Sequence, residues 1–428
     1  MTYDLIVEGK IVDPIDGVEE TRVGIIGDRI AKIGASLSGR NVLAVPDSYV
    51  FPGFIDPHVH YREPGAEHKE DFYTGTRASC HGGCTTALDM PNNNPPAVTR
   101  NAMQKKIEAA KAKGIIDVKF YAGVHPKHLN ELKPMERLPE VIGYKVFLSD
   151  TFGIEDAGIG YLEEAMKAIT GTGKTGTGKR GTEKPVSFHC ETPRINEMAS
   201  SKYDPADKLY HCYARPQLSE ILAIPYVLLL SSRIPVHIAH LSTADGLEFI
   251  TQYKNSGADV SCEVTSHHLL YNMNEMLRLG SYAKMNPPLR PESDRRAVWS
   301  GLKDKVDMLA TDHAPHTKEE KDSPNPPSGV PGADNYSNIA SMLIEAFGPA
   351  RTAQLTSYNA ARRFGMHDRG RMQEGMLADI VVMEMKECWP NRLYTKCGWS
   401  PYEGMRFPGR ATHTIYRGKI IMEDGELR

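Results

Sequence analysis

Apolar residues recur along this chain in short runs that end in polar residues, with helical stretches between them. One run surrounds Phe54, and seven more occupy residues 85–90, 119–124, 143–148, 186–190, 236–240, 259–264 and 307–312. Strand-like runs that alternate with helical stretches are typical of a parallel sheet. Eight is the number of parallel strands that closes a barrel, so the pattern predicts an α/β fold, a TIM-like (β/α)8 barrel, over residues 51–365.

The two ends of the chain have a different pattern, with short apolar stretches separated by Gly and Asp turns. These stretches lie at residues 4–13 and 23–33 near the start and at 378–383 and 412–422 near the end. Strands this short are stable only when they meet in one sheet or sandwich. We therefore expect residues 1–50 and 366–428 to form one small composite β-sandwich domain.

Composition excludes several classes of protein. A chain of 428 residues with a formal net charge of -3 can bury a large core and has no basic footprint for nucleic acid. It contains no apolar run long enough to cross a membrane, and its first residues lack the pattern of a signal peptide, so we expect a cytoplasmic protein. Its seven cysteines, without a Cys-x-x-Cys pair, predict reduced and mostly buried thiols.

A glycine- and lysine-rich segment at 171–184 resembles a phosphate-binding loop but does not fit the GxxxxGK[ST] pattern. In one register Ala168 stands where the first Gly belongs, and in the other Arg180 follows Gly178-Lys179. The segment also precedes a predicted strand, whereas a phosphate loop follows one. Its composition is typical of a flexible basic surface insertion.

Metal-ligating residues gather at the carboxyl ends of the predicted strands, where barrel enzymes place their active sites. His58 and His60 are two positions apart in an extended segment, so their imidazoles project to the same face. His189, His240 and Asp312 end three other apolar runs. One such histidine is more often a packed core residue, but four histidines and an aspartate at strand ends predict a metal site.

Lys145 lies in the middle of a predicted strand, where an unpaired ammonium is costly to bury. A lowered pKa would let this amine react with CO2, and the resulting carbamate has two oxygens that could bridge two cations. The alternatives are a lysine that extends to the end of the barrel and Asp150 as the bridging carboxylate. His237 points to the opposite side of its strand from His240, so we expect it to pack or to form hydrogen bonds.

Five polar motifs follow one another along the chain: His58-Val-His-Tyr-Arg-Glu-Pro-Gly65, Met90-Pro-Asn-Asn-Asn-Pro95, Cys262-Glu-Val-Thr-Ser-His-His-Leu-Leu270, Lys284-Met-Asn-Pro-Pro-Leu-Arg290 and Thr311-Asp-His-Ala-Pro-His316. In this order they resemble motifs of the dihydroorotases of the amidohydrolase superfamily, and the resemblance extends from one end of the chain to the other. The HxHxR and DHAPH pair is the specific part of the match.

The resemblance implies a binuclear zinc centre. His58, His60 and Asp312 would bind the more buried ion, His189 and His240 would bind the second, and a carboxylated Lys145 would bridge the two. Some bacterial relatives use an aspartate in place of this lysine, at a position that matches Asp150, but the Tyr-Lys-Val-Phe-Leu context favours Lys145. Glu263 would support a ligand or hold an additional ion, and we expect a structural role for it.

The same resemblance implies a set of substrate contacts. Arg62, Asn92 and His316 would hold a substrate carboxylate, Asn286 would add a contact, Thr151 and Phe152 would lie at the tip of a mobile loop, and Ser328 would belong to a loop that touches substrate through its backbone. The implied reaction is the reversible cyclisation of N-carbamoyl-L-aspartate to (S)-dihydroorotate in pyrimidine (UMP) biosynthesis. Two zinc ions would activate a water, and Asp312 would carry its proton to the leaving ring nitrogen.

Two alternatives remain at the level of sequence. Allantoinases and dihydropyrimidinases are cyclic amidases of the same superfamily, but their substrates lack the carboxylate that Arg62 would bind in bidentate fashion. A non-catalytic homologue that supports a partner enzyme would be expected to have lost metal ligands, and none is missing here. We expect a small-molecule substrate and no nucleic-acid or membrane partner. The resemblance leaves open a homodimer or an association with aspartate transcarbamoylase.

Overall fold

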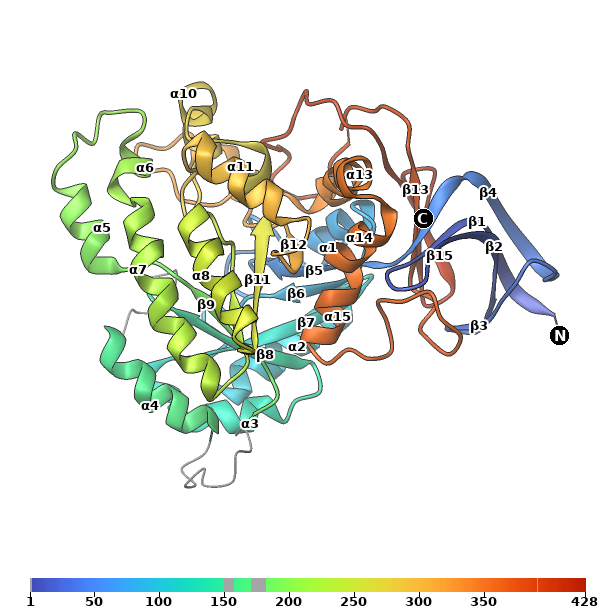
Figure 1. The fold of residues 1–428 in the computed structure, drawn as a ribbon, viewed down its shortest axis with the longest axis horizontal. Coiled ribbons are helices and arrows are strands. Elements are labelled where there is room, and N and C mark those ends of the chain that lie inside the picture. The colour runs from blue at the N-terminus through green and yellow to red at the C-terminus, as the bar shows by residue number, and fades with distance from the viewer. Residues whose placement is uncertain (1, 150–157, 171–181, 391) are drawn as a thin grey trace.

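The computed structural model describes residues 2–149, 158–170, 182–390 and 392–428, and it places a parallel barrel beside a second sheet (Figure 1). The barrel strands pair in sequence order: β5 (Phe54–Val59), β6 (Cys84–Asp89), β7 (Asp117–Gly123), β8 (Val141–Phe147), β9 (Val186–His189), β10 (Val236–Ile238), β11 (Val260–Thr265) and β12 (Met308–Ala310). A parallel bridge between Val59 and His313 brings the last strand back to the first. The predicted (β/α)8 barrel is confirmed.

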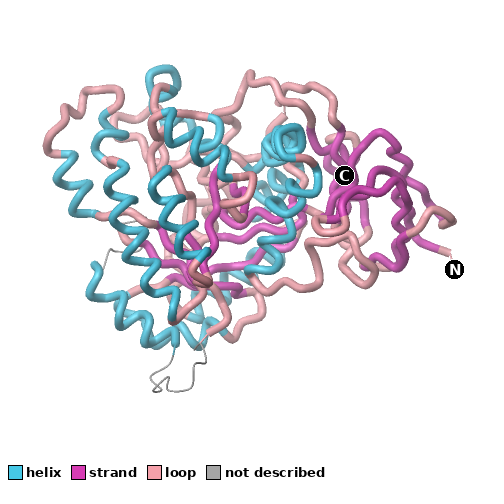
Figure 2. The backbone as a smooth tube through the Cα atoms, viewed as in Figure 1, coloured by secondary structure: helices cyan, strands magenta, loops and turns pink. Residues whose placement is uncertain are grey.

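Helices surround the barrel strands on the outside (Figure 2). The longer ones are α1 (Phe72–His81), α2 (Arg100–Lys113), α4 (Gly158–Thr170), α5 (Pro193–Ser200), α7 (Gln217–Leu228), α8 (Ala244–Asn255), α11 (Glu292–Gly301) and α13 (Tyr336–Phe347). The starts of α1, α2 and α8 follow from the sequence, because a capping side chain satisfies a free backbone N–H group at each of them. Asp71 accepts a hydrogen bond from the Thr74 amide at 2.9 Å, and Thr243 accepts one from the Gly246 amide at 3.2 Å.

Short helices and turns complete the connections. The short α-helices are α3 (Leu132–Glu136), α6 (Tyr210–Ala214), α9 (Ser266–Leu270), α10 (Glu275–Leu279), α12 (Lys318–Lys321), α14 (Pro349–Ala353) and α15 (Asn359–Arg363). The 3-10 segments are η1 (Pro126–Glu131), η2 (Leu229–Ser232), η3 (Gly280–Ala283) and η4 (Ala333–Asn335), and η5 (Gln354–Tyr358) is a π-helical turn. Among these, α9 and α12 directly follow site-bearing segments.

The second sheet is built from both ends of the chain, as predicted. Its strands are β1 (Tyr3–Asp13), β2 (Gly17–Ile26), β3 (Arg29–Ile33), β4 (Gly39–Pro52), β13 (Ile380–Glu384), β14 (Arg410–Tyr416), β15 (Lys419–Glu423) and β16 (Glu426–Leu427). The long strand β4 joins the two halves, because it pairs in parallel with β1 and antiparallel with β13. Val7, Val23 and Ile380 are fully buried in the apolar core of this sheet. The exact domain boundaries stay a prediction.

The chain passes from the second sheet into the barrel through one glycine. Gly53 lies between β4 and β5, and a Cβ atom there would stand 2.3 Å from Oγ1 of Thr85. Only a residue without a side chain lets these backbones approach so closely. The barrel therefore starts at a fixed position relative to the sheet. This fixes where His58, on β5, and His60, directly after β5, lie along the barrel axis.

Other expectations from the sequence can be compared with the described residues. All seven cysteines are free thiols and six are buried, as predicted. In the described ranges no helix combines the length and the apolar character needed to span a membrane. Asp150, Thr151 and Phe152 lie outside the described residues, and so does most of the basic segment, residues 171–181. The described Thr182 and Lys184 contact Glu136, which precedes β8 at the amino end of the barrel strands.

Candidate active site

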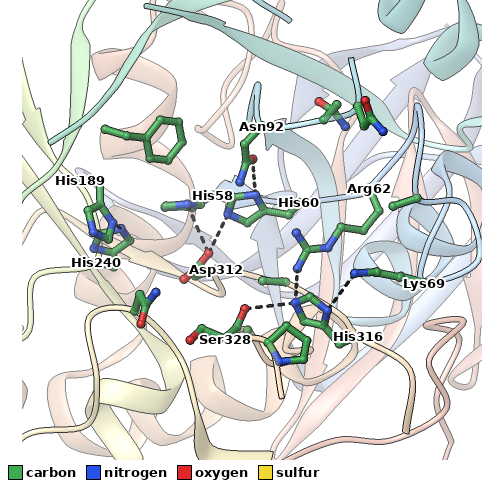
Figure 3. Close-up of a pocket in the computed structure, with 18 residues that line it drawn as sticks. His58, His60, Arg62, Lys69, Asn92, His189, His240, Asp312, His316 and Ser328 are labelled. Carbon is green, nitrogen blue, oxygen red and sulfur yellow. Dashed lines mark hydrogen bonds and ion pairs between the residues drawn. The ribbon is translucent and has the colours of Figure 1, made fainter. Parts of the chain in front are cut away.

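The carboxyl ends of the barrel strands surround a cavity of about 260 Å³ (Figure 3). Ten of the predicted site residues line it: His58, His60, Arg62, Asn92, His189, His240, Asn286, Asp312, His316 and Ser328. They come from segments spread over most of the chain, and the barrel brings them to one end. Lys145 does not line the cavity, because it is fully buried in β8. Thr151 lies outside the described residues.

His58, His60 and Asp312 form one group of potential metal ligands. The Asp312 Oδ1 atom lies 3.3 Å from Nε2 of His58 and 3.0 Å from Nε2 of His60. One ligand atom from each of the three residues lies within 4.8 Å of the others. Burial alone would raise the pKa of Asp312, but the neighbouring His58 and the hydrogen bond to His60 hold it well below its ordinary value. The carboxylate is therefore ionised at neutral pH.

Asp312 and His240 do not end their strands, contrary to the expectation from sequence. β12 ends at Ala310 and β10 at Ile238, so each residue lies two positions further along. Both take left-handed backbone conformations, with φ of 47° for Asp312 and 36° for His240. A residue in this region leaves the strand ladder and turns its side chain in a new direction. That turn is what aims both side chains into the cavity (Figure 3).

His189 and His240 form the second group. Nδ1 of His189 lies 3.0 Å from Nε2 of His240, and their rings meet edge to face. The other nitrogen of His189 is held by Glu191 at 2.7 Å, and Glu191 in turn makes a two-point ion pair with Arg215. A carboxylate on the far nitrogen of a ligating histidine fixes which nitrogen is free for an ion. Here that free nitrogen is Nδ1 of His189.

Glu263 contacts one histidine of each group, His58 and His240. Its carboxylate contacts Nδ1 of His58, lies 2.9 Å from Nε2 of His237, and accepts a hydrogen bond from the His240 amide at 3.3 Å. His237 also contacts the Ser261 hydroxyl at 2.8 Å, so it forms hydrogen bonds outside the cavity, as predicted. Because Glu263 occupies the far nitrogen of His58, it leaves Nε2 of that ring for the cavity. This is the structural role expected for Glu263.

Lys145 is the most unusual buried cation of the site. Its ammonium has no hydrogen-bond partner among the described residues and lies 5.3 Å from the ring centroid of Phe147. Burial lowers its pKa to about 8, although the negative charges of Glu263 and Asp312 oppose the shift. The neutral form of this amine is therefore easier to reach than that of an ordinary lysine. Neutral lysine is the form that reacts with CO2.

The donor set fits divalent metal ions. Imidazole nitrogens and a carboxylate converge on one cavity, and these are the ligands that zinc binds. Burial lowers the pKa of His60 to about 4, so this ring is neutral and has a lone pair to offer. In the described part of the chain Nδ1 of His240 and Nζ of Lys145 lack hydrogen-bond partners. Buried polar atoms without hydrogen-bond partners are expected at a site whose ligands bind a metal ion.

A second wall of the cavity is positively charged. Nε of Arg62 donates to the Pro315 carbonyl at 3.1 Å, and Nη2 lies 3.1 Å from Nε2 of His316. Burial lowers the pKa of Arg62 to about 10. Because this value is still well above neutral pH, the guanidinium remains charged. Its backbone is also left-handed, with φ of 63°. Because Pro315 holds the Nε edge, the terminal nitrogens of Arg62 face the cavity.

Two asparagines line the space between these walls. Oδ1 of Asn92 lies 2.7 Å from Nδ1 of His60, which ties it to the first ligand group. Oδ1 of Asn286 is buried and has no hydrogen-bond partner among the described residues. Amides in such positions offer both donors and acceptors to a polar ring.

Sequence reasoning missed two lysines near this site. Lys69 lines the cavity and lies 3.2 Å from Nδ1 of His316. Lys321 is buried and donates to the carbonyls of Pro327 and Gly329 at 3.0 and 2.9 Å. Neither lysine belongs to a periodic pattern. Only the contacts between distant segments give them a role.

Known proteins with similar sequences or folds include several cyclic amide hydrolases. The model of the amidohydrolase family matches residues 49–421. A dihydroorotase from Methanothermobacter thermautotrophicus is 33% identical over 423 residues, which cover 95% of this chain and 91% of that protein. An allantoinase from Rubrobacter xylanophilus is 32% identical over 447 residues, which cover 99% of this chain and 95% of that protein.

The fold has solved counterparts as well. The structure of an L-hydantoinase (dihydropyrimidinase) from Arthrobacter aurescens superposes with a TM-score of 0.93 over 100% of this chain and 98% of that one, at 23% identity. The family match spans the barrel and all the residues that line the cavity. The chain therefore belongs to the amidohydrolase family and is a hydrolase that acts on cyclic amides.

Proposed function

We propose that this protein is a dihydroorotase, which interconverts (S)-dihydroorotate and N-carbamoyl-L-aspartate in pyrimidine biosynthesis. The observation that carries this proposal is the placement of Arg62 in the wall of the cavity, across from the His58, His60 and Asp312 group (Figure 3). Dihydroorotate carries its hydrolysable amide and a carboxylate on one small ring. The names of the relatives at 33% identity support the same reaction.

The carboxylate of the substrate would bind the terminal nitrogens of Arg62, which face the cavity. A planar guanidinium matches a carboxylate with two parallel hydrogen bonds, and the pairing is strongest where water is excluded. Arg62 is only 9% exposed, so the pair would form in a largely dry site. This orientation directs the ring amide of dihydroorotate toward Asp312.

Asp312 would move the proton during the reaction. Its ionised carboxylate accepts the proton of the attacking water and delivers it to the ring nitrogen as the amide bond breaks. The contacts with His58 and His60 keep that carboxylate in place. A divalent ion held by these residues would lower the pKa of a bound water and polarise the amide carbonyl.

The metals that we propose are two zinc ions. The His58, His60 and Asp312 group would hold one, and His189 and His240 would hold the other. A carboxylated Lys145 would bridge them, formed when the neutral amine attacks CO2, a nitrogen–carbon bond forms, and one proton leaves. The lowered pKa of Lys145 and its lack of a hydrogen-bond partner among the described residues support this assignment.

The test compares two substrates that differ only in the ring carboxylate, dihydroorotate and dihydrouracil. A charge-assisted pair contributes about 1.5–3 kcal/mol, so we expect kcat/KM to favour dihydroorotate by at least about tenfold. Arg62→Ala should reduce turnover of dihydroorotate by a similar factor and leave dihydrouracil nearly unchanged. Equal losses on both substrates would assign Arg62 to the support of the fold alone.

Hydrolysis of allantoin is the alternative that the relatives raise, since three of them at 30–32% identity over almost the whole chain are named allantoinases. Allantoin has no carboxylate to pair with Arg62, and for that reason we place it second. A cytoplasmic location and either a homodimer or an association with aspartate transcarbamoylase stay proposals that rest on the family resemblance.

A further inference from the structure

The ring of His316 lies among four polar groups, two at each nitrogen. Nδ1 is 3.2 Å from Nζ of Lys69 and 3.2 Å from Oε2 of Glu320. Nε2 is 3.1 Å from Nη2 of Arg62 and 3.1 Å from the Ser328 carbonyl oxygen. Each nitrogen therefore has one neighbour that can only donate and one that can only accept.

These neighbours define two hydrogen-bond sets that exclude each other. In the first set Nδ1 accepts from Lys69, and the hydrogen on Nε2 points to the Ser328 carbonyl and the cavity. In the second set the hydrogen is on Nδ1 and points to Glu320, and Nε2 accepts from Arg62. A neutral imidazole carries one hydrogen, so the ring adopts one set at a time.

The ring is neutral under ordinary conditions. Burial lowers its pKa far below the ordinary value of histidine, and the positive charges of Arg62, Lys69 and Lys321 lower it further. His316 is only 5% exposed, which keeps water from replacing these partners. The choice between the two tautomers therefore decides what Nε2 presents to the cavity.

A bound carboxylate would distinguish the two sets. Carboxylate oxygens only accept hydrogen bonds, so they favour a hydrogen on Nε2 and are repelled by its lone pair. A carboxylate on Arg62 would also draw away the N–H group that the second set requires. The first set then remains, and it depends on the donor that Lys69 offers to Nδ1.

We propose that Lys69 is a positioning residue that sets the tautomer of His316, so that Nε2–H of His316 faces the carboxylate of the substrate. Lys69 is 8% exposed, and its ammonium pairs with Glu320 at 3.0 Å, which holds it beside the ring. This inference rests on the proposed function, because it takes a carboxylate as the ligand. It makes Lys69 a determinant of specificity that acts through His316.

The experiment uses zinc-loaded full-length protein and two unreactive rings, orotate with a carboxylate and uracil without one. Protein labelled with 15N in histidine reports the tautomer of each ring by NMR, and the His316→Gln variant identifies the His316 signal by its loss. The variants are Lys69→Met, which removes the donor, Lys69→Arg, which keeps a donor-only cation, and Glu320→Gln as the control for the paired carboxylate.

The expected results separate the tautomer from simple charge. With orotate bound, the hydrogen of the His316 ring should be on Nε2 in the wild type and in Lys69→Arg. In Lys69→Met it should be on Nδ1, both with orotate and without ligand. Lys69→Met should bind orotate at least about tenfold more weakly, the range of one charge-assisted hydrogen bond, and should bind uracil normally. Glu320→Gln should keep the hydrogen on Nε2 and bind orotate within about threefold of the wild type.

Two outcomes would overturn the inference. If Lys69→Met keeps the hydrogen on Nε2, Lys69 does not set the tautomer, whatever happens to orotate binding. If the tautomer changes but orotate binding does not, the tautomer has no part in specificity. Failure of the proposed function has a different signature: the wild type would bind orotate no better than uracil, while Lys69→Met would still move the hydrogen in the ligand-free protein.

Discussion

At the scale of single residues, the site depends on side chains whose backbone is unusual. Arg62, His240 and Asp312 all have positive φ, which costs on the order of 1–3 kcal/mol for each residue that is not glycine. Contacts with the rest of the barrel offset this cost. The left-handed backbone conformation turns the three side chains into the cavity. The sequence identified these residues because their types and order match a family. It gave no sign of their backbone conformation, which arises from contacts with distant strands.

Lys145 carries a prediction about metal content. Two neighbouring divalent ions repel each other unless an anion lies between them, so loss of the bridge should cost an ion. We expect Lys145→Ala to contain less zinc than the wild type by mass spectrometry, with activity partly restored by small carboxylic acids. Metal-free wild type should regain activity faster when zinc is supplied together with bicarbonate.

The control for this experiment is reconstitution with zinc alone in CO2-depleted buffer. Full zinc content in Lys145→Ala, together with loss of an ion in Asp150→Ala, would transfer the bridging role to Asp150. The lowered pKa of Lys145 and its lack of a partner among the described residues favour the first result.

At the scale of elements, the segments after the strands are held by long-range contacts. Lys321 at the end of α12 donates to Pro327 and Gly329, and its ammonium lies 5.8 Å from the ring centroid of Trp399. Trp399 itself donates to the His316 carbonyl at 2.7 Å. Eight strands and their order could be predicted from apolar runs. These contacts could not, because they join residues whose separation in sequence carries no periodic signal.

Lys321→Met should loosen the loop that contains Ser328. Removal of the ammonium leaves buried carbonyls unsatisfied, at a cost of about 1–3 kcal/mol. We expect faster hydrogen exchange at the amides of Ser328 and Gly329 and a rise in KM for dihydroorotate of about tenfold or more, with a smaller change in kcat. Lys284→Met is the matched control, since half-buried Lys284 donates to Pro326 in the same loop. Equal effects in both variants, or unchanged exchange in Lys321→Met, would contradict this role.

At the scale of the whole molecule, Asp117 joins the barrel to the sheet formed by the two termini. At the start of β7 it contacts Arg369 at 2.8 Å, the Tyr416 hydroxyl at 2.8 Å and Arg417 at 3.1 Å. Burial alone would raise its pKa, but Arg369 and the hydrogen bond from Tyr416 lower it to about 2. The meeting of the two termini could be predicted from their short strands. This half-buried cluster of contacts could not, because no pattern near Asp117 in the sequence indicates its partners.

Asp117→Asn should destabilise the fold in a pH-dependent way. A carboxyl group whose pKa falls from 3.8 to about 2 on folding contributes about 2 kcal/mol of stability above its unfolded pKa. That contribution is lost as the pH falls through the folded pKa, so the difference between wild type and variant should shrink between about pH 4 and about pH 2. Denaturant unfolding at several pH values measures it.

Asp368→Asn is the control for this comparison, because Asp368 also contacts Arg369 at 3.1 Å but has a side chain that is 45% exposed. It should change stability by less than about 1 kcal/mol, as exposed pairs do. A difference between wild type and Asp117→Asn that does not vary with pH would show that the charge of Asp117 is not what stabilises the junction.

The most direct test of the proposed reaction is a competition among ring substrates. Zinc-reconstituted protein is given equal concentrations of dihydroorotate, allantoin and hydantoin, and the initial rates of product formation are followed by mass spectrometry. Because only dihydroorotate offers a carboxylate to Arg62, we expect it to be consumed at least about tenfold faster than either neutral ring. Faster consumption of allantoin or hydantoin would contradict the assignment as a dihydroorotase while leaving the amidohydrolase fold and family intact.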